Sequence, residues 1–265
     1  MTSILMCPPD YYAIDYEINP WMHVRNKADQ KKAKKQWENL HDIINNLGVK
    51  IEIIKPIKGL PDMVFTANAG LAFGRKFIKS NFRYKERKGE EKHFAGWFDK
   101  KGYEVFTIPR AIHFEGEGDI LKIDDSFFAG YVIRSDIRAH EIISKITGKR
   151  VLSLELVNKR FYHLDTCFAP LSDKAIIYYP RAFDAFGRKV ITKNIKTRIP
   201  VNAKDAARFC CNAVTIGETA IINSRCKDAK DNLKNHGMKV IETDLSEFIK
   251  AGGSAKCLVL FIDNC

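Results

Sequence analysis

The sequence lacks the cysteine pairs that would indicate a disulfide framework or a zinc site. Its 7 cysteines are odd in number and irregularly spaced, and no two of them form a CxxC pair. We therefore predict no metal site, and we expect most cysteines to be small buried side chains, with at most one or two in a chemical role. They are Cys7, Cys167, Cys210, Cys211, Cys226, Cys257 and Cys265.

Long apolar runs are also missing. No stretch approaches the roughly 20 apolar residues that cross a bilayer, so we expect no membrane partner. The first residues, MTSILMCPPD, have neither a charged n-region nor a long apolar h-region, and they do not form a secretory signal. These features predict a cytoplasmic protein.

Acidic residues are scarce relative to basic ones. The chain has 32 Asp and Glu against 44 Lys and Arg, a formal net charge of +12. That excess is typical of nucleic-acid-binding proteins, but the chain has no zinc finger, aromatic RNA-binding signature or Walker loop. Its densest basic segments, 31–35 and 83–92, are predicted on surface helices, so we interpret the charge as a solvated surface and expect no nucleic acid.

An internal repeat is the most informative feature that is present. Two apolar strands joined by a polar turn recur at 69–82, 118–131, 167–180 and 212–224. A polar residue lies at or just before each first strand, and a last strand is predicted to begin at Cys257. The spacings are 115 − 68 = 47, 163 − 115 = 48, 212 − 163 = 49 and 257 − 212 = 45. The residues at these positions are Asn68, Glu115, His163, Asn212 and Cys257.

Helical periodicity lies between the hairpins, and most helical stretches are followed by a single strand. No Pro/Gly/Ser-rich linker interrupts the pattern, so we predict one α/β domain over 1–265, with about five ββαβ modules closed into a pseudo-fivefold ring. In a closed ring the five repeat positions would converge on one central site. Alternatively, each of these residues merely caps a strand. The predicted helices are 29–47, 135–148, 203–211 and 228–236, and the strands are 49–56, 103–109, 150–156 and 239–244.

The repeat positions carry reactive chemistry. Cys257 follows a glycine-rich loop, where Lys256 and open backbone amides would lower the pKa of the thiol. His163 stands two residues before Asp165, a carboxylate that would orient the imidazole for proton transfer. Glu115 lies among glycines, although Glu117 and Asp119 are nearby and spacing alone does not choose between the three carboxylates.

Carboxylates match a planar guanidinium through paired hydrogen bonds. A bound guanidinium carbon would be attacked by the thiolate, and loss of an amine would leave an S-alkylthiouronium that water hydrolyses. This chemistry requires no cofactor, and its partner is a small molecule. The sequence leaves open whether the chain forms a homo-oligomer.

Six motifs together resemble the guanidine-modifying enzyme superfamily of arginine deiminases, dimethylarginine dimethylaminohydrolases, amidinotransferases and arginine dihydrolases. They are MCPPDYY…DYEINPWM, PDMVFTAN, FEGEGDIL, HLDTCF, NAV and GGSAKCLVL, and they span nearly the whole chain. The resemblance implies a five-bladed α/β propeller, or pentein. It also implies Cys257 as nucleophile, His163 as acid/base, Glu115 as the carboxylate that binds guanidinium and positions the histidine, Asp165 as a second carboxylate, Asp62 near the substrate amine or guanidinium, and Arg134 for the α-carboxylate.

Within that superfamily the chain most resembles the arginine dihydrolase branch. Deiminases carry an acid where this chain has Asn68, whereas asparagine at both Asn19 and Asn68 is typical of dihydrolases. The resemblance thus implies hydrolysis of arginine to ornithine, CO2 and ammonia, with the loop 10–22 as a candidate lid. Dimethylarginine hydrolysis is the first alternative, and an amidinotransferase or an inactive basic binding protein is the second.

Overall fold

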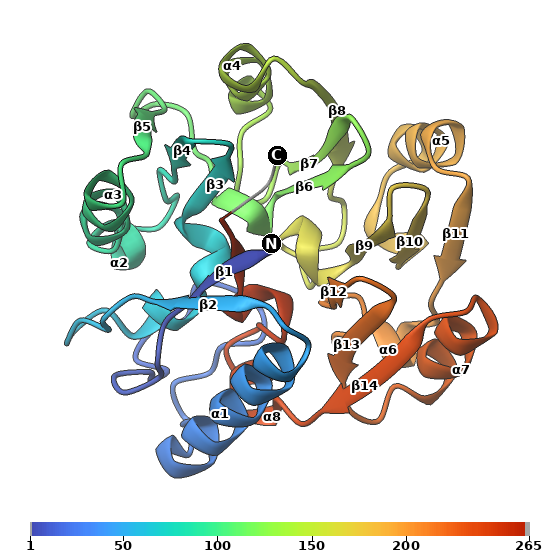
Figure 1. The fold of residues 1–265 in the computed structure, drawn as a ribbon, viewed down its shortest axis with the longest axis horizontal. Coiled ribbons are helices and arrows are strands. Elements are labelled where there is room, and N and C mark those ends of the chain that lie inside the picture. Colours follow the sequence, from blue (N-terminus) through green and yellow to red (C-terminus); the bar gives the residue numbers. More distant parts are fainter. Residues whose placement is uncertain (1, 263–265) are drawn as a thin grey trace.

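Five small β-sheets lie around a common centre in a computed structural model of the chain, which describes residues 2–262 (Figure 1). Each sheet has three strands, and its middle strand runs antiparallel to the strand before it and parallel to the strand after it. The four predicted hairpins are thereby confirmed. The sheets are β15–β1–β2 (Leu260–Phe261, Ser3–Met6, Lys50–Ile53), β3–β4–β5 (Gly70–Phe73, Lys76–Lys79, Glu104–Thr107), β6–β7–β8 (Ile120–Ile123, Ser126–Tyr131, Arg150–Glu155), β9–β10–β11 (Phe168–Ser172, Ala175–Tyr178, Thr197–Pro200) and β12–β13–β14 (Val214–Ile216, Thr219–Asn223, Lys239–Thr243).

The first sheet joins the two ends of the described chain. Strand β1 pairs antiparallel with β15, with Leu5 opposite Leu260, and parallel with β2. The sequence did not predict β1, because a four-residue apolar segment has too little alternation to identify a strand. Its pairing partner β15 is more than 250 residues away along the chain, so only the closed ring brings the two strands together.

Helices connect the parallel strands, as such crossovers require, and the longer ones lie on the outside of the ring (Figure 1). Helix α1 matches the prediction for 29–47: Asp29 caps it by accepting from the Lys32 N–H at 3.0 Å, and Leu40 and Ile44 are buried. No helix within residues 2–262 is long and apolar enough to span a bilayer. The helices are α1 (Gln30–Asn46), α2 (Lys85–Lys88), α3 (Glu91–Lys100), α4 (Arg138–Thr147), α5 (Ala185–Asn194), α6 (Ala203–Ala206), α7 (Lys227–Asn235) and α8 (Ser246–Ile249).

The prediction of one solvated helix over 83–92 is wrong. The segment forms the short helix α2 and then α3, and both Arg87 in α2 and Glu90 just before α3 are buried. The Arg87 guanidinium donates to Glu90 through both Nε, at 2.9 Å, and Nη2, at 2.8 Å. A buried charge needs such a partner, and sequence periodicity gives no sign of an inward-facing arginine.

Two further helices differ from the prediction. Helix α6 ends at Ala206 instead of 211, and Phe209 adopts a left-handed φ of 60°, which turns the chain toward Asn212. Helix α5 was not predicted at all, although Asp184 caps it by accepting from the Gly187 N–H at 2.7 Å. Its few buried residues leave a weak apolar stripe, which explains why periodicity missed it.

The six described cysteines are buried free thiols. This agrees with the prediction that most of them are small core side chains. Cys265 lies outside the described residues.

Gly116, at the centre of the ring, has no room for a side chain. Its φ is +61°, and an added Cβ would lie 2.6 Å from the Gly70 nitrogen and 2.7 Å from the Ala67 carbonyl oxygen. Those atoms are backbone and cannot move aside without shifting the neighbouring turn. By contrast, Gly217 has a similar φ of +56° but open space around the same position.

We predict that Gly116→Ala lowers the free energy of unfolding by about 3 kcal/mol or more, since steric overlap adds to the left-handed backbone penalty. Gly217→Ala is the matched control and should cost only about 1 to 2 kcal/mol, the left-handed penalty alone. Urea denaturation followed by circular dichroism measures both. Equal losses in the two variants would contradict close packing at Gly116.

Candidate active site

The five repeat positions lie on turns that enter the first strands of the sheets. The prediction that Cys257 begins a strand is wrong, because it sits on a 3-10 turn and β15 starts only at Leu260. Asn68 lies in the 3-10 turn Thr66–Ala69, Glu115 just before Gly116–Gly118, His163 just before Leu164–Thr166, Asn212 two residues before β12, and Cys257 in Lys256–Leu258.

Hydrogen bonds join these turns to one another. Asn68 Nδ2 lies 3.5 Å from the Glu115 carbonyl oxygen, and Glu115 Oε2 lies 2.7 Å from His163 Nε2. Further round the centre, Asn212 Nδ2 donates to the Asp165 carbonyl at 3.0 Å and lies 3.1 Å from Cys257 Sγ. The structure thus brings all five repeat positions to one place.

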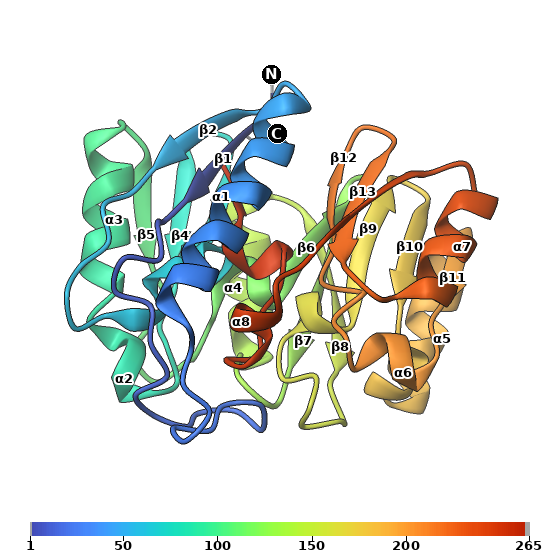
Figure 2. The same ribbon diagram turned by 90° about the horizontal axis from the view of Figure 1, so that it is seen from below.

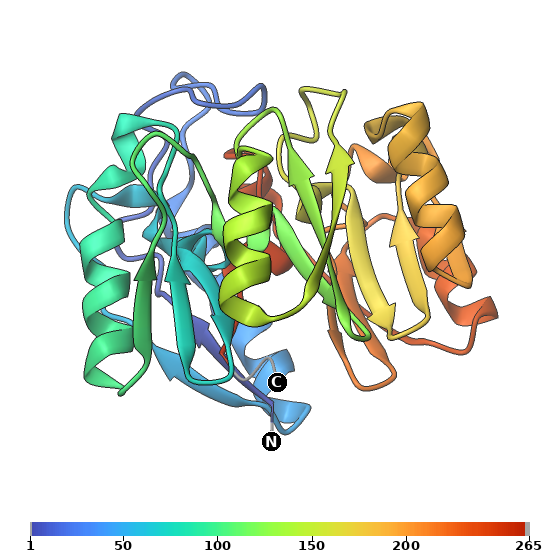
Figure 3. The ribbon, with the colours of Figure 1, turned by 90° about the horizontal axis from the view of Figure 1, so that it is seen from above.

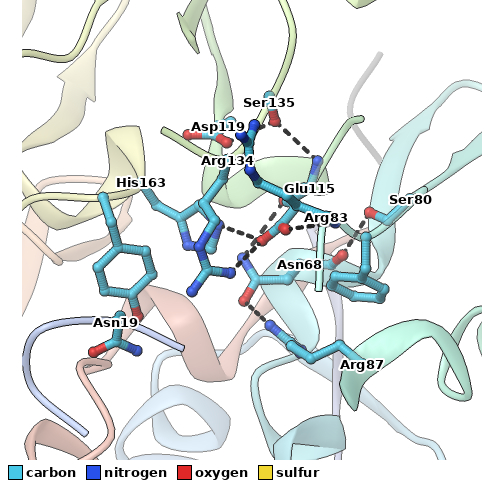
Figure 4. Close-up of polar contacts among 12 residues, drawn as sticks. Asn19, Asn68, Ser80, Arg83, Arg87, Glu115, Asp119, Arg134, Ser135 and His163 are labelled. Atoms are coloured by element: carbon cyan, nitrogen blue, oxygen red, sulfur yellow. Dashed lines mark hydrogen bonds and ion pairs between the residues drawn. The ribbon is translucent and has the colours of Figure 1, made fainter. Parts of the chain in front are cut away.

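The prediction that Asp165 orients the imidazole is wrong, because the carboxylate that contacts the ring is Glu115 (Figure 4), whereas Asp165 faces the thiol. Glu115 Oε2 also accepts from Arg134 Nη1 at 2.8 Å, and its Oε1 accepts from the Arg83 N–H at 3.1 Å. Burial alone would raise the pKa of Glu115, but Arg134 and His163 outweigh burial and hold that pKa well below its usual value. Glu115 is therefore a buried anion.

The neighbouring carboxylates take other partners, which resolves the choice that spacing left open. Asp119 accepts from the Ser135 hydroxyl at 2.6 Å and from the Leu164 N–H at 3.1 Å, so it braces the turn after His163. Burial raises the pKa of Asp119 to about 6. Glu117 points to Lys256 Nζ, at 2.9 Å.

Cys257 is held by an amide and a carboxylate. The side-chain oxygen of Asn212 accepts from the Cys257 N–H at 3.2 Å and from the Ser254 N–H at 3.1 Å, while the thiol donates to Asp165 Oδ2 at 3.3 Å. The sequence repeat had marked Asn212, but its role as the clamp on the cysteine turn is visible only in the structure.

The expectation that Lys256 lowers the pKa of Cys257 is not met. Burial, reinforced by the negative charge of Asp165, raises the pKa of Cys257 well above its usual value, and a backbone hydrogen bond from Ser254 opposes this only in part. The Lys256 ammonium is instead turned to Glu117. Burial also raises the pKa of Asp165 to about 7, against the attraction of Lys256. The raised pKa favours the protonated form of the thiol.

A narrow cavity lies beside the thiol, and its free volume of about 10 Å³ is close to that needed by a single water molecule. Asp62 Oδ1, in the cavity lining, has no hydrogen-bond partner among the described residues, and the same is true of His163 Nδ1, Asp165 Oδ1 and Ser254 Oγ in the turns that meet at the centre. Buried polar atoms are normally satisfied, so these unpartnered groups mark where a ligand with hydrogen-bonding groups would be favoured. The cavity is lined by Ile18, Asn19, Asp62, Phe65, Asn68, Arg87, Arg134, Tyr162, Ala251 and Cys257.

Two buried arginines form part of the cavity wall. Arg134 lies between the rings of Tyr84 and Tyr162, 4.7 Å from each centroid, and its Nη2 donates to the Ile18 carbonyl at 2.9 Å. Arg87, which sequence analysis did not predict as a site residue, donates to the Asn68 side-chain oxygen at 2.8 Å (Figure 4). Both guanidinium groups are engaged with protein acceptors in this state.

The N-terminal loop 10–22 lies across the cavity, as the lid hypothesis requires. Asn19 Nδ2 donates to the Ala251 carbonyl at 3.0 Å, Tyr12 donates to the Glu247 carbonyl at 2.8 Å, and Trp21 Nε1 donates to the Arg160 carbonyl at 2.7 Å. The loop covers the end of the ring opposite the two termini (Figures 2 and 3). Asn19 therefore reaches the site only because this loop is folded over it.

Within residues 2–262, no three His, Cys, Asp or Glu side chains lie close enough together to hold a metal ion.

Comparison with known proteins identifies the family. A family model described as N,N dimethylarginine dimethylhydrolase, eukaryotic, matches residues 11–263. The chain is 47% identical over 262 residues to the bifunctional arginine dihydrolase/ornithine cyclodeaminase ArgZ of Synechocystis sp., covering 97% of this chain and 37% of that protein. It is 41% identical to the N(G),N(G)-dimethylarginine dimethylaminohydrolase of Mycobacterium tuberculosis, covering 97% of this chain and 84% of the relative.

Comparison with solved structures supports the same family. The N-terminal domain of a mutant of ArgZ, an arginine dihydrolase from cyanobacteria, bound to substrate, superimposes with a TM-score of 0.96 at 45% identity, covering 99% of this chain and 98% of that one. The chain thus spans little more than a third of the full-length bifunctional proteins. The resemblance to guanidine-modifying enzymes is confirmed, and the chain belongs to the N,N-dimethylarginine dimethylhydrolase family.

Proposed function

We propose that this chain is an arginine dihydrolase that attacks the guanidinium carbon of arginine through a covalent intermediate on Cys257. The observation that carries the proposal is that the Cys257 thiol, which lines the cavity, contacts Asp165, whose other carboxylate oxygen is unpartnered, while Glu115 and His163 form a buried pair in the adjoining turns. The substrate-bound ArgZ domain, with which this chain shares its fold and 45% of its residues, supports the same chemistry.

Asp165 is the proposed acceptor for the guanidinium. Its Oδ2 touches the thiol and its Oδ1 is unpartnered, so an N–H group bound there would bring the guanidinium carbon next to the sulfur. Both oxygens of Glu115 already have partners. We therefore assign Glu115 mainly to orienting His163, and Asp62, with its unpartnered Oδ1, to the substrate amine.

The α-carboxylate of the substrate is proposed to bind Arg134, as the resemblance implies. Nη2 of Arg134 donates to the Ile18 carbonyl of the loop 10–22. A carboxylate is a stronger acceptor than a carbonyl, so it would replace that contact, and its binding would be coupled to the position of the loop.

A cationic substrate solves the problem of the protonated thiol. Burial raises the pKa of Cys257, but a guanidinium beside it favours the thiolate. The thiolate adds to the guanidinium carbon, and His163 delivers the thiol proton to the departing ammonia. Water, deprotonated by His163, then attacks the S-alkylthiouronium, and citrulline forms as the C–S bond breaks.

A second round accounts for the dihydrolase products. Citrulline presents a ureido carbon to the same thiol, release of ammonia leaves a thiocarbamate, and water releases ornithine and CO2. Two waters are consumed and two ammonia molecules leave for each arginine. Neutral Asn68 and Asn19 suit this round, because an amide can donate to a ureido oxygen and an acidic side chain would repel it.

We further propose that residues 1–265 act as one catalytic domain and that the five sheets are blades of a pseudo-fivefold α/β propeller. The alternation of sheet and outer helix, and the meeting of the first-strand turns at the centre, support this interpretation.

Methylarginine hydrolysis is the second candidate. The family model carries that activity in its description, and the Mycobacterium relative of that name is matched over 84% of its length. The same thiol and imidazole would release a methylamine instead of ammonia, provided that the cavity accommodates the methyl groups.

We predict that arginine gives ornithine and ammonia in a ratio of one to two. Amino-acid analysis together with an ammonia assay measures this, with asymmetric dimethylarginine as the parallel substrate. Accumulation of citrulline alone would contradict the second round. Dimethylamine from methylarginine at a higher kcat/KM than ammonia from arginine would favour the second candidate.

Cys257→Ser should lower kcat at least about a thousandfold, because the nucleophile is lost. Cys7→Ser is the matched control, since Cys7 is also fully buried but packs in the hydrophobic core and does not line the cavity, and it should keep wild-type kcat. Mass spectrometry of acid-quenched wild-type protein should find a substrate adduct on the Cys257 peptide alone. An adduct on another cysteine would overturn the assignment.

Activity should also depend on the ionisation of Asp165, whose pKa burial raises to about 7. The proposed acceptor must be ionised to bind a guanidinium, and a raised pKa keeps it protonated at acidic pH. The plot of log kcat/KM against pH should therefore steepen below about pH 7, since kcat/KM reports groups of the free enzyme. A profile with no change of slope between pH 5 and 8 would contradict this role.

A further inference from the structure

A second buried ion pair lies directly behind the proposed nucleophile. Lys256 Nζ is 2.9 Å from Glu117 Oε2 and donates to the Val259 carbonyl at 3.0 Å, and the same Glu117 oxygen accepts from the Phe261 N–H at 3.1 Å. Lys256 is 5% exposed and Glu117 is 3% exposed. The two charged side chains are thus almost entirely shielded from water.

The pair connects the two turns that carry the reacting groups. Glu117 belongs to the turn Gly116–Gly118, which follows Glu115, and Lys256 belongs to the turn Lys256–Leu258, which carries Cys257. These turns are more than 130 residues apart in sequence. One ion pair therefore fixes the cysteine turn against the turn of the carboxylate that orients His163.

Stability alone is a poor explanation for such a pair. Removing two charges from water costs about as much as their attraction returns, and hydrophobic replacements of a buried pair are often neutral or stabilising. A buried pair placed beside a reactive centre is better explained by the geometry and the electric field that it imposes.

We propose that Glu117 and Lys256 are positioning residues for the reaction, which hold Cys257 at its distance from Glu115 and His163 and bias the charge on Asp165. This inference rests on the proposed function, because the kinetic part of its test measures that activity. Neither residue touches the cavity in which the substrate is proposed to bind, so both act through Cys257 and Asp165.

The effect of the Glu117–Lys256 pair on the charge of Asp165 depends on the titratable groups that surround this carboxylate. Lys256 and Cys257 face it from their turn, Glu117 from the turn across the centre, and Tyr162 and Cys167 from its own segment. The Lys256 ammonium lowers the pKa of Asp165, whereas the Glu117 carboxylate raises it, both against a larger increase caused by burial. Loss of Lys256 should therefore raise the pKa of Asp165, and loss of Glu117 should lower it.

The test compares Lys256→Met, Glu117→Gln and the double variant. The pH at which log kcat/KM changes slope should rise in Lys256→Met and fall in Glu117→Gln, and it should return close to the wild-type value in the double variant. All three should lose about tenfold or more in kcat with KM changed less than about threefold, because the reacting atoms are misplaced while substrate contacts remain. Lys256→Arg should recover most of the kcat.

Lys79→Met is the matched control, since Lys79 pairs with Glu91 at 3.2 Å on a partly buried outer position. It should lower stability slightly and leave the pH profile unchanged. If one single variant does not fold, the double variant and Lys256→Arg still separate the two roles, because thermal unfolding reports structure and kcat reports positioning.

Titration of Asp165 by carbon NMR of aspartate-labelled protein, assigned with Asp165→Asn, gives the same shifts without any substrate. This arm keeps the inference testable even if wild-type protein fails to hydrolyse arginine, an outcome that would count against the proposed function only. Shifts of the same sign in both single variants, or lower stability with unchanged kcat and pH profile, would overturn the positioning role.

Discussion

Polar side chains buried at the centre of a ring of sheets must find their partners there, and the site depends on this constraint. Glu115 is fully buried, and three donors from other segments, Arg83, Arg134 and His163, keep it ionised. Asn212 likewise satisfies two N–H groups of the cysteine loop. Because each partner comes from a different part of the chain, the centre forms only when the ring closes.

Hydrogen-bond partners distinguish the buried carboxylates with a structural role from those available to a ligand. Glu115 and Asp119 have their oxygens occupied, whereas Asp62 and Asp165 each keep one unpartnered oxygen among the described residues. A cation would gain most where acceptors are buried and unpaired, which is where the thiol lies. The proposed chemistry thus follows from which groups the fold leaves unsatisfied.

Much of the local structure could be predicted, because β-hairpins and amphipathic helices produce characteristic residue patterns within short stretches of sequence. The hairpins and helix α1 are examples. Strand β1, the inward turn of Arg87 and the early end of α6 could not be predicted, since each depends on partners distant in sequence. A segment of four apolar residues becomes a strand only when β15 and β2 are beside it.

The sequence by itself determined which residues stand at the repeat positions and therefore which chemistry is available, since period and residue type need no coordinates. Tertiary structure decided which residue takes which role. Glu115, and not Glu117 or Asp119, contacts the imidazole. Lys256 pairs with Glu117 and not with the thiol. These choices depend on differences of a few ångströms and on burial. Spacing along a chain encodes neither, because both arise only when distant turns meet.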